Sequence, residues 1–216
     1  MAYDFNTIAE NYDRMNHMMT CGLDRHWRKR AVRGLQGKVL DVACGTGDMC
    51  VLLAERGVTV TGVDISEEML AIAKRKVENV EWGVADAERL PFEDNTFDAV
   101  TCAFGVRNFV HLEQGLGEMM RVLKPDGHMV ILELATPDSP LIRPFYNIYT
   151  KNIIPWLGSR IAGSREAYTY LPESIERFPK GKAFSKIIDH LGGITTERKL
   201  TFGVCRLYTI EKQRGR

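Results

Sequence analysis

The chain has 216 residues and a mass of 24.5 kDa, which predicts one domain with a sizeable core. Hydrophobic residues make up 44% and charged residues 26%, so disordered, collagen-like and low-complexity architectures are excluded for most of the chain. The 29 basic residues oppose 28 acidic ones, and a net charge of +1 gives no whole-chain signature for binding nucleic acid or an anionic membrane.

From Lys38 onward, short apolar runs alternate with helical stretches. The helix after the second strand has Ser66 as an N-cap, with acids in its first turn and bases in its last. Continuous apolar strands separated by helices are typical of a parallel sheet covered on both faces. The strands are predicted at 39–43, 58–63, 80–85, 97–104 and 127–134, and the helices at 48–56, 66–76 and 112–123.

The C-terminal part departs from this alternation. A helix is predicted at 184–191, followed by strands at 194–200 and 204–211 that pair as an antiparallel hairpin through Thr201–Gly203. Two segments, 1–37 and 136–180, fit no alternation and are interpreted as additions around the sheet. We therefore expect a single domain made of an N-terminal helical cap (1–37), a cofactor-binding core (38–134), a substrate or lid insertion (135–180), and a final helix and hairpin (181–216).

The five cysteines are odd in number and form no C-x-x-C pair, so a disulfide framework or zinc cluster is not indicated. We expect no metal. The N-terminus Met1–Asn6 lacks the basic and apolar segments of a signal peptide, and no run approaches the ~18 apolar residues of a membrane span. We therefore expect a cytoplasmic protein.

The first strand ends in a turn with two glycines, within Asp41-Val42-Ala43-Cys44-Gly45-Thr46-Gly47. Glycines let the backbone turn sharply and approach a ligand closely. A third glycine of the dinucleotide fingerprint would stand where Cys50 is, and the chain has no G-K-S/T sequence. The turn is expected to bind a ligand but shows no motif for binding a phosphate.

One acid follows each of three consecutive strands. Asp64 ends the second strand and is placed to accept hydrogen bonds from ribose hydroxyls, and Asp86 could accept one from an adenine amine. Three acids suit a neutral or cationic nucleoside better than a phosphorylated one. Other interpretations stay open: Asp41 as a structural acid at the turn, Asp86 as a helix N-cap and Asp64 as a solvated acid.

A series of four motifs resembles that of class I S-adenosylmethionine-dependent methyltransferases. It consists of the turn from Asp41 to Gly47, Asp64, Asp86-Ala87 and Arg121-Val122-Leu123-Lys124-Pro125-Asp126-Gly127. The resemblance implies a Rossmann-like α/β fold: a seven-stranded, mostly parallel sheet with helices on both faces and a C-terminal antiparallel hairpin. It implies S-adenosyl-L-methionine as cofactor and S-adenosyl-L-homocysteine as product. The positions implied to hold them are Asp41, Gly45, Thr46, Gly47, Asp64, Asp86, Ala87 and Ala103.

Three further segments resemble the demethylmenaquinone methyltransferase family, which includes the ubiquinone-pathway C-methyltransferases. They are Tyr12-Asp13-Arg14-Met15-Asn16 with the residues up to Arg28, Phe104-Gly105-Val106-Arg107-Asn108, and the segment from Tyr170 to Pro179. The chain departs from the family at Thr20 and Ala135, where the family usually has serine. The resemblance implies methylation of a ring carbon of a prenylated quinol.

The residues carry a plausible chemistry for this reaction, because a quinol becomes a better carbon nucleophile as a hydroxyl loses its proton. Arg107 could stabilise the phenolate or hold a water acting as base, Asn108 could donate to a ring oxygen, and Tyr12 could orient the ring. The alternatives are a surface or structural ion pair for Arg107, a helix cap for Asn108 and packing on the sheet for Tyr12. The remaining candidates are interpreted as surface or capping residues: His17, His26 and His111.

Two basic segments suit contact with a bilayer. Residues 139–165 contain four bases, no acid and several aromatic residues, and residues 25–33 contain five bases, with only Asp24 as an acid beside them. They predict a peripheral contact with the inner face of the membrane, where a prenylated quinol resides. The alternatives are a substrate lid and a solvated helix face. A homodimer is compatible with the sequence.

Three hypotheses follow. The first is conversion of demethylmenaquinol to menaquinol, with a ubiquinone-pathway benzoquinol as the alternative acceptor. The second is an RNA methyltransferase, which the lack of an added RNA-binding module disfavours, so no nucleic acid is expected as a partner. The third is a non-catalytic nucleoside-binding protein, which the intact turn and the acids disfavour.

Overall fold

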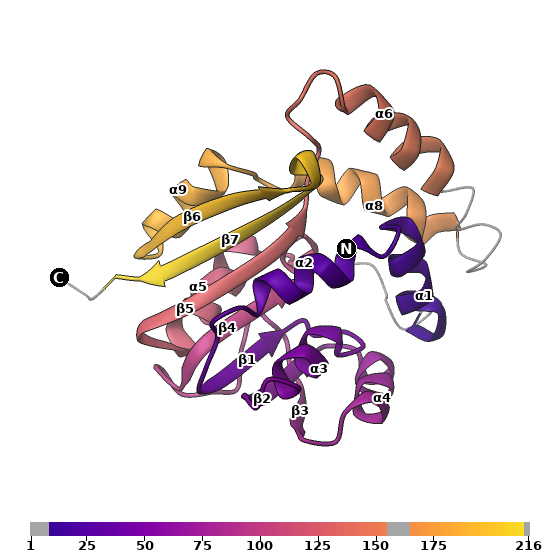
Figure 1. Ribbon diagram of the computed structural model, residues 1–216. Coiled ribbons are helices and arrows are strands. Elements are labelled where there is room, and N and C mark those ends of the chain that lie inside the picture. Colours follow the sequence, from indigo (N-terminus) through magenta and orange to yellow (C-terminus); the bar gives the residue numbers. More distant parts are fainter. Residues whose placement is uncertain (1–8, 155–164, 214–216) are drawn as a thin grey trace.

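The computed structural model describes residues 9–154 and 165–213, which fold around one seven-stranded sheet (Figure 1). Its order is β3-β2-β1-β4-β5-β7-β6. Strands β1 to β5 run parallel, and β7 is antiparallel to both of its neighbours, so the predicted sheet and hairpin are confirmed. The strands are β1 Lys38–Val42, β2 Thr59–Asp64, β3 Val80–Val84, β4 Phe97–Ala103, β5 Leu123–Leu134, β6 Gly193–Leu200 and β7 Cys205–Lys212.

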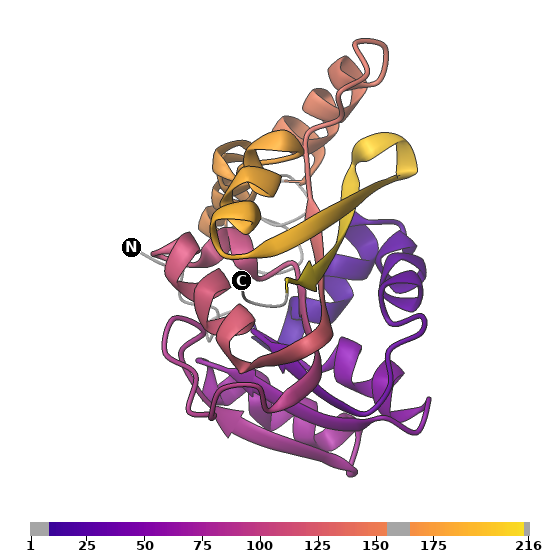
Figure 2. The same ribbon diagram turned by 90° about the vertical axis from the view of Figure 1, so that its left-hand side faces the viewer.

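Helices cover both faces of the sheet. Helices α2 and α3 pack on one face, and α5 and α9 pack on the other (Figure 2). The helical segments are α1 Ala9–Met19, α2 Leu23–Ala31, α3 Asp48–Ala54, α4 Glu67–Lys76, η2 Val106–Asn108, α5 Leu112–Val122, α6 Arg143–Ile148, η3 Tyr149–Ile153, α8 Arg165–Arg177, α9 Lys182–His190 and η4 Thr201–Gly203.

Strand β1 shows why the apolar runs are continuous. Leu40 and Val42 belong to the core beneath α5 and α9, whereas Val39 belongs to the core beneath α2 and α3. Successive side chains of a strand point to opposite faces, and here both faces are buried. The predicted start of α4 is also confirmed, because the Ser66 hydroxyl accepts a hydrogen bond from the Met69 amide at 3.1 Å.

Strand β5 begins earlier than predicted. Leu123 already pairs with Phe97 of β4, and the pairing shifts register before it resumes at His128. The turn-like sequence Pro125-Asp126-Gly127 is therefore held inside the strand.

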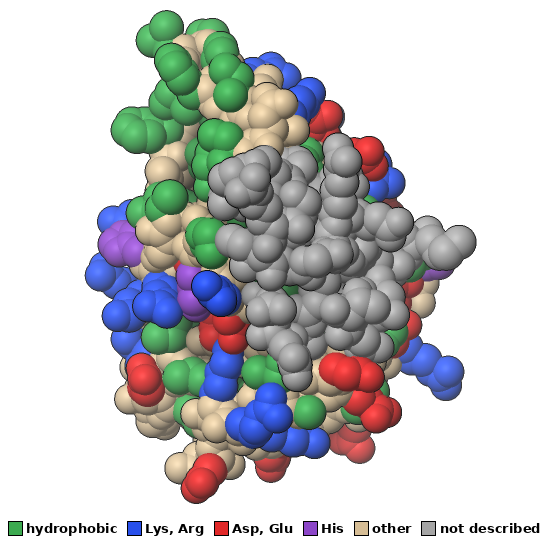
Figure 3. Space-filling view, turned by 90° about the vertical axis from the view of Figure 1, so that its right-hand side faces the viewer, with side chains coloured by type: hydrophobic (Ala, Val, Ile, Leu, Met, Phe, Trp, Pro, Cys, Tyr) green, Lys and Arg blue, Asp and Glu red, His purple; other side chains and the backbone are tan. Residues whose placement is uncertain are grey.

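The segments outside the alternation gather at one end of the sheet. Helices α1, α6 and α8 lie beyond the carboxyl ends of the central strands (Figure 1). Hydrophobic side chains collect at the end formed by α6 (Figure 3). In the part of the chain described, no helix is long and apolar enough to cross a membrane. Some residues of the sequence-based predictions lie outside the described residues: Met1–Asn6, Trp156, Leu157 and Arg160.

Candidate active site

The strand order puts a crevice where β1 and β4 lie side by side, because the chain continues from them in opposite directions. Each strand is followed directly by a residue with left-handed backbone, Ala43 after β1 with a φ of 52° and Phe104 after β4 with a φ of 62°. Such conformations strain residues that carry a side chain, and they cluster at functional sites. Two adjacent strand ends with this strain mark the crevice as the candidate active site.

The crevice contains an acid-lined cavity of about 180 Å³. Three of the described residues that line it are acidic and none is basic: Asp64, Asp86 and Glu88 carry the charge. This charge suits a cationic nucleoside such as S-adenosylmethionine and disfavours a phosphate. The cavity is lined by Tyr12, Ala43, Gly45, Asp64, Ile65, Met69, Ala85, Asp86, Ala87, Glu88, Ala103, Phe104, Gly105, Asn108, Phe109 and Val110.

Asp64 is held rigidly at the end of β2. Its Oδ2 accepts a hydrogen bond from the Gly45 amide at 2.8 Å, and its Oδ1 accepts one from the Ser66 amide at 2.9 Å. Burial raises the pKa of this carboxyl, although both backbone bonds act in the opposite direction. Each carboxylate oxygen can accept further hydrogen bonds. Asp64 can therefore accept from ribose hydroxyls without losing its backbone contacts.

Asp86 is exposed and forms a turn of its own, in which its Oδ1 accepts a hydrogen bond from the Glu88 amide at 2.9 Å. The turn closes as a bridge to Arg89 and starts no helix, so the helix-cap interpretation of Asp86 is wrong. Gly45, Ala87 and Ala103 line the cavity as well, as expected for three of the matched positions.

Asp41 does not line the cavity. Its carboxyl is 1% exposed and accepts hydrogen bonds from the Thr101 hydroxyl at 2.6 Å and the Cys50 thiol at 3.3 Å. Burial raises its pKa to about 6. The geometry supports the interpretation of Asp41 as a structural acid.

Asp41→Asn is expected to remove a pH dependence of stability. Because the folded pKa lies above the unfolded one, the stability that the protonated carboxyl contributes falls by about 3 kcal/mol as pH rises from about 4 to 6. Asparagine cannot ionise, so the variant gains stability over the parent at pH 7.5 and gains less at pH 4. Urea unfolding at both pH values measures this difference. Asp189→Asn is the control, because Asp189 is an exposed residue of α9. An equal difference at both pH values would contradict it.

Two other positions that match the methyltransferase motif, Thr46 and Gly47, make contacts within the protein. The Thr46 hydroxyl donates to the Asp13 carboxylate, which ties α1 to the turn. Gly47 has a φ of 81°, and a Cβ there would lie 2.8 Å from the Trp82 ring. Neither residue lines the acid-lined cavity.

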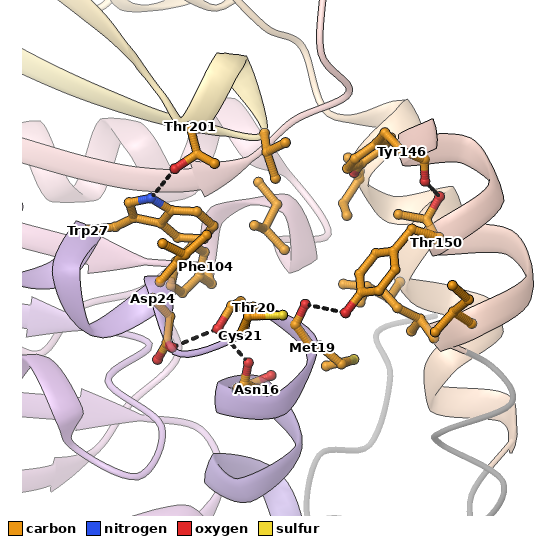
Figure 4. Close-up of a pocket in the computed structure, with 18 of the residues that line it drawn as sticks. Asn16, Met19, Thr20, Cys21, Asp24, Trp27, Phe104, Tyr146, Thr150 and Thr201 are labelled. Atoms are coloured by element: carbon orange, nitrogen blue, oxygen red, sulfur yellow. Dashed lines mark hydrogen bonds between the residues drawn. The ribbon is translucent and has the colours of Figure 1, made fainter. Parts of the chain in front are cut away.

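A second, apolar cavity of about 530 Å³ adjoins the first (Figure 4). Its walls come from α1, α2, α6, η3, α8 and the η4 turn. The Trp27 indole donates to the Thr201 hydroxyl at 2.9 Å, and the Tyr149 hydroxyl donates to the Met19 carbonyl at 2.9 Å. These bonds fix the hairpin to α2 and η3 to α1, and so hold the walls together.

Tyr12 and Phe104 line both cavities. They therefore mark the junction at which a group bound in one cavity faces a group bound in the other. Tyr12 comes from α1 and Phe104 from the strained end of β4.

Arg107 reaches the apolar cavity from η2, with its side chain 6% exposed. Its Nη1 lies 2.8 Å from Oε1 of Glu133, which is 1% exposed, and also donates to the Phe104 carbonyl. Its buried Nε has no hydrogen-bond partner among the described residues. The predicted alternative of an ion pair is thus present, but in the wall of the cavity rather than at the surface.

The charge of Arg107 acts on a phenol inside this cavity. Burial raises the pKa of Tyr146 and the Arg107 guanidinium opposes that rise, because it favours the ionised phenol. A quinol hydroxyl in the same cavity would experience the same sign of potential.

Asn108 lies on the other side of the junction. It lines the acid-lined cavity and not the apolar one, and its Oδ1 accepts a hydrogen bond from the Tyr170 hydroxyl at 3.2 Å. Asn108 therefore does not line the apolar cavity that Arg107 reaches.

The histidines divide into two kinds. His26 and His111 are exposed, as expected, and His111 contacts Glu88 at 2.8 Å. The surface interpretation is wrong for His17, whose Nδ1 lies 2.7 Å from the buried Asp24 carboxylate. Asp24 and Thr20 line the apolar cavity, and neither position was predicted from the sequence.

Three side chains lie close together here, with a polar atom of each within 4.8 Å of the others: His17, Asp24 and Asp48. Arg28 Nε lies 4.0 Å from Asp24 and 3.9 Å from Asp48, and Lys76 lies 2.7 Å from Asp48. The protein's own cations therefore balance these acids.

Comparisons with known proteins show the family and the fold. Residues 2–212 match the model of the ubiE/COQ5 methyltransferase family. The chain is 42% identical to a demethylmenaquinone methyltransferase of Bacteroides fragilis, over 96% of this chain and 90% of that protein. It is 41% identical to a ubiquinone/menaquinone biosynthesis C-methyltransferase of Geobacter sulfurreducens, over 96% and 86%. A solved S-adenosylmethionine-dependent methyltransferase of Thermotoga maritima shares the fold, with a TM-score of 0.69, 18% identity and coverage of 97% and 98%.

Proposed function

The chain belongs to the ubiE/COQ5 methyltransferase family, and we propose on this premise that it converts demethylmenaquinol to menaquinol with S-adenosylmethionine as methyl donor. The observation that carries the proposal is the pair of adjoining cavities, one acid-lined and one apolar, that share Tyr12 and Phe104. The first suits a cationic nucleoside, and the second suits an aromatic ring with a hydrocarbon tail.

The acid-lined cavity is proposed to hold the cofactor. Asp64 accepts from the ribose hydroxyls, Asp86 from the adenine amine, and the backbone at Gly45 passes close to the ligand. When bound, S-adenosylmethionine supplies an electrophilic methyl group on a sulfonium. Asn108 closes the cavity and orients Tyr170 through their hydrogen bond.

The apolar cavity is proposed to hold the quinol ring. Arg107 stabilises negative charge on a ring oxygen, and Glu133 holds the guanidinium in place. Tyr12 orients the ring at the junction. Because water is largely displaced from such a cavity, the fixed positive charge acts more strongly than it would in solution.

The function is tested with the purified full chain, S-adenosylmethionine and a short-chain demethylmenaquinol kept reduced. Mass spectrometry is expected to show one added methyl group on the naphthoquinol, with less product from a benzoquinol and none from RNA. Transfer to the benzoquinol alone would assign the acceptor to the ubiquinone pathway. Transfer to RNA, or to no quinol, would overturn the proposal.

The mouth of the apolar cavity is proposed to contact a bilayer. Its proposed apolar rim consists of four exposed residues, two that line the cavity and two that are next to lining residues in the sequence: Leu141 (80% exposed), Phe145 (75%), Ile148 (56%) and Phe202 (78%). Phe145 and Ile148 also line the cavity, and Arg143 and Lys151 flank them at the surface. Apolar side chains beside bases suit an anionic lipid interface, from which a prenylated quinol could enter.

The basic segment 25–33 contributes less than predicted. Arg28 is 7% exposed and stacks on the Phe104 ring, with its guanidinium carbon 4.9 Å from the ring centroid. It therefore supports the cavity wall, and only the other bases of the segment are exposed.

The Phe145→Ser/Phe202→Ser variant is expected to bind anionic vesicles at least about tenfold more weakly, since each buried phenylalanine contributes about 1.5–3 kcal/mol. Flotation with phosphatidylcholine–phosphatidylglycerol vesicles measures the bound fraction. Ile194→Ser is the matched control, because Ile194 is 53% exposed at the end of β6 distant from η4. Equal flotation of the parent and the double variant would refute docking through this rim.

A further inference from the structure

The proposed reaction requires a proton acceptor beside the ring. Replacing a ring hydrogen with the methyl cation that the cofactor supplies releases one proton per turnover. The ring is activated when a quinol hydroxyl gives up its proton, and that hydroxyl is restored when the methylated carbon loses its hydrogen. The surface of the apolar cavity that would hold the ring is mostly apolar, so few side chains in its wall can receive the hydroxyl proton.

A hydrogen-bonded chain of three side chains starts in the wall of this cavity, and Figure 4 shows its first two members, Thr20 and Asp24. Thr20, in the turn after α1, lines the cavity. Its Oγ1 lies 2.7 Å from Oδ1 of Asp24 and 2.8 Å from the Asn16 carbonyl, so its one proton is shared between these two acceptors. The other oxygen of Asp24 lies 2.7 Å from Nδ1 of His17. Asp24 itself is 1% exposed and lines the same cavity.

The chain leads away from the cavity toward a charged recess. His17 is half-buried and lines a separate recess of about 370 Å³, with Asp48 and Lys76 among its other walls. Asp24 therefore lies between the apolar cavity and this recess. The Arg28 Nε atom lies 4.0 Å from Asp24, so a positive charge stands close to the buried carboxylate.

We propose that Thr20 contacts the quinol hydroxyl and passes its proton to Asp24, while His17 holds Asp24 in place. The hydroxyl proton moves to Thr20 Oγ1 as the threonine proton moves to Asp24 Oδ1. Asp24 becomes neutral, and the ring oxygen becomes a phenolate that faces Arg107 in the same cavity. His17 donates from Nδ1 to Oδ2, which orients the carboxylate. Asp24 loses its proton to water after the product leaves, which completes the balance.

This assignment rests on the proposed function. It gives the formation of the phenolate and its stabilisation to different residues. Arg107 is always charged and cannot readily accept a proton, so it stabilises the phenolate without forming it. A carboxylate accepts a proton readily, and a hydroxyl can receive one proton while it gives another. The cavity wall supplies both groups already bonded to each other.

Thr20→Val tests the assignment, because valine keeps the shape of threonine and lacks the hydroxyl. The single-turnover rate with saturating quinol is expected to fall by about 10²-fold, with little change in the dissociation constants for S-adenosylmethionine and quinol. Thr20→Ser should recover most of the rate, and Thr196→Val on exposed β6 is the control outside the cavity. His17→Gln keeps an N–H donor and should lose less rate than Asp24→Asn.

A spectroscopic readout needs no cofactor. A naphthol without a prenyl tail should absorb at longer wavelength when bound to the parent or Thr20→Ser, because its hydroxyl hydrogen-bonds toward Asp24, and should show less of this shift on Thr20→Val. Parent-like rate and spectrum for Thr20→Val would overturn the inference, as would an equal loss in Thr20→Ser. An inactive parent would overturn the proposed function instead, and the spectrum would still test the hydrogen-bonded chain.

Discussion

Arg107→Met is expected to lower the rate of methyl transfer by about 10²–10³-fold, the usual effect of removing a preorganised charge from a site of developing negative charge. Affinity for S-adenosylmethionine should stay close to that of the parent, because Arg107 lines the apolar cavity and not the acid-lined one. Isothermal titration and single-turnover kinetics measure the two effects separately.

Loss of the ion pair complicates this variant. Glu133 is 1% exposed, and removal of its partner leaves a buried charge unbalanced, which typically costs about 3–5 kcal/mol of stability. The Arg107→Met/Glu133→Gln double variant removes both charges and should recover part of that stability, measured by urea unfolding.

The double variant distinguishes catalysis from folding. If Arg107 acts on the phenolate, the double variant stays slow although it is more stable than Arg107→Met. If its rate returns with its stability, Arg107 supports the fold alone and the electrostatic role is refuted. Glu133→Gln by itself keeps the guanidinium and is expected to lose less rate than Arg107→Met.

Asp64→Asn is expected to weaken S-adenosylmethionine binding by about 10²-fold or more, because hydrogen bonds to a charged acceptor contribute about 1.5–3 kcal/mol each. The carboxylate also accepts from the amides of Gly45 and Ser66. An asparagine NH₂ would face one of these N–H groups and loosen the turn. Asp86→Asn should have a smaller effect, since Asp86 is exposed.

The raised pKa of Asp64 predicts how binding of S-adenosylhomocysteine depends on pH. Burial raises the pKa of Asp64 above its ordinary value, so the carboxylate takes up a proton earlier as pH falls. Affinity for S-adenosylhomocysteine should therefore decrease as pH is lowered through this raised pKa, and Asp64→Asn should lose that dependence. Titration calorimetry across the acidic range measures it. If Asp64→Asn binds with the affinity of the parent, the Asp64 carboxylate does not take part in binding.

The core of the fold was predictable because its signals are local. The buried strands appear as continuous apolar runs, and Ser66 begins α4 as expected. The longer β5 was not predictable, because pairing with β4 overrides the turn-like Pro125-Asp126-Gly127. The helices between β5 and α9 pack around a cavity formed by segments far apart in the chain, and no local periodicity encodes such packing.

The site was predictable where one turn or strand end sets the geometry, as at Gly45 and Asp64. It was less predictable where partners are distant. Arg107 and Glu133 meet across 26 positions, although an acid inside the apolar strand β5 was a signal that could have been used. His17 looked like a surface residue because nothing nearby in the sequence reveals that the Asp24 beside it is buried.

The position of β7 has a consequence for how the protein is made. In the sheet, β6 pairs with β7 and with no other described strand, and β7 joins it to β5. On the ribosome, β6 therefore emerges without a partner and can join the sheet only when β7 has followed it. The η4 turn between them supplies Thr201, which anchors Trp27 at the apolar cavity. The half with the acid-lined cavity can assemble early in synthesis, and the wall of the apolar cavity is completed only when the η4 turn and β7 have appeared.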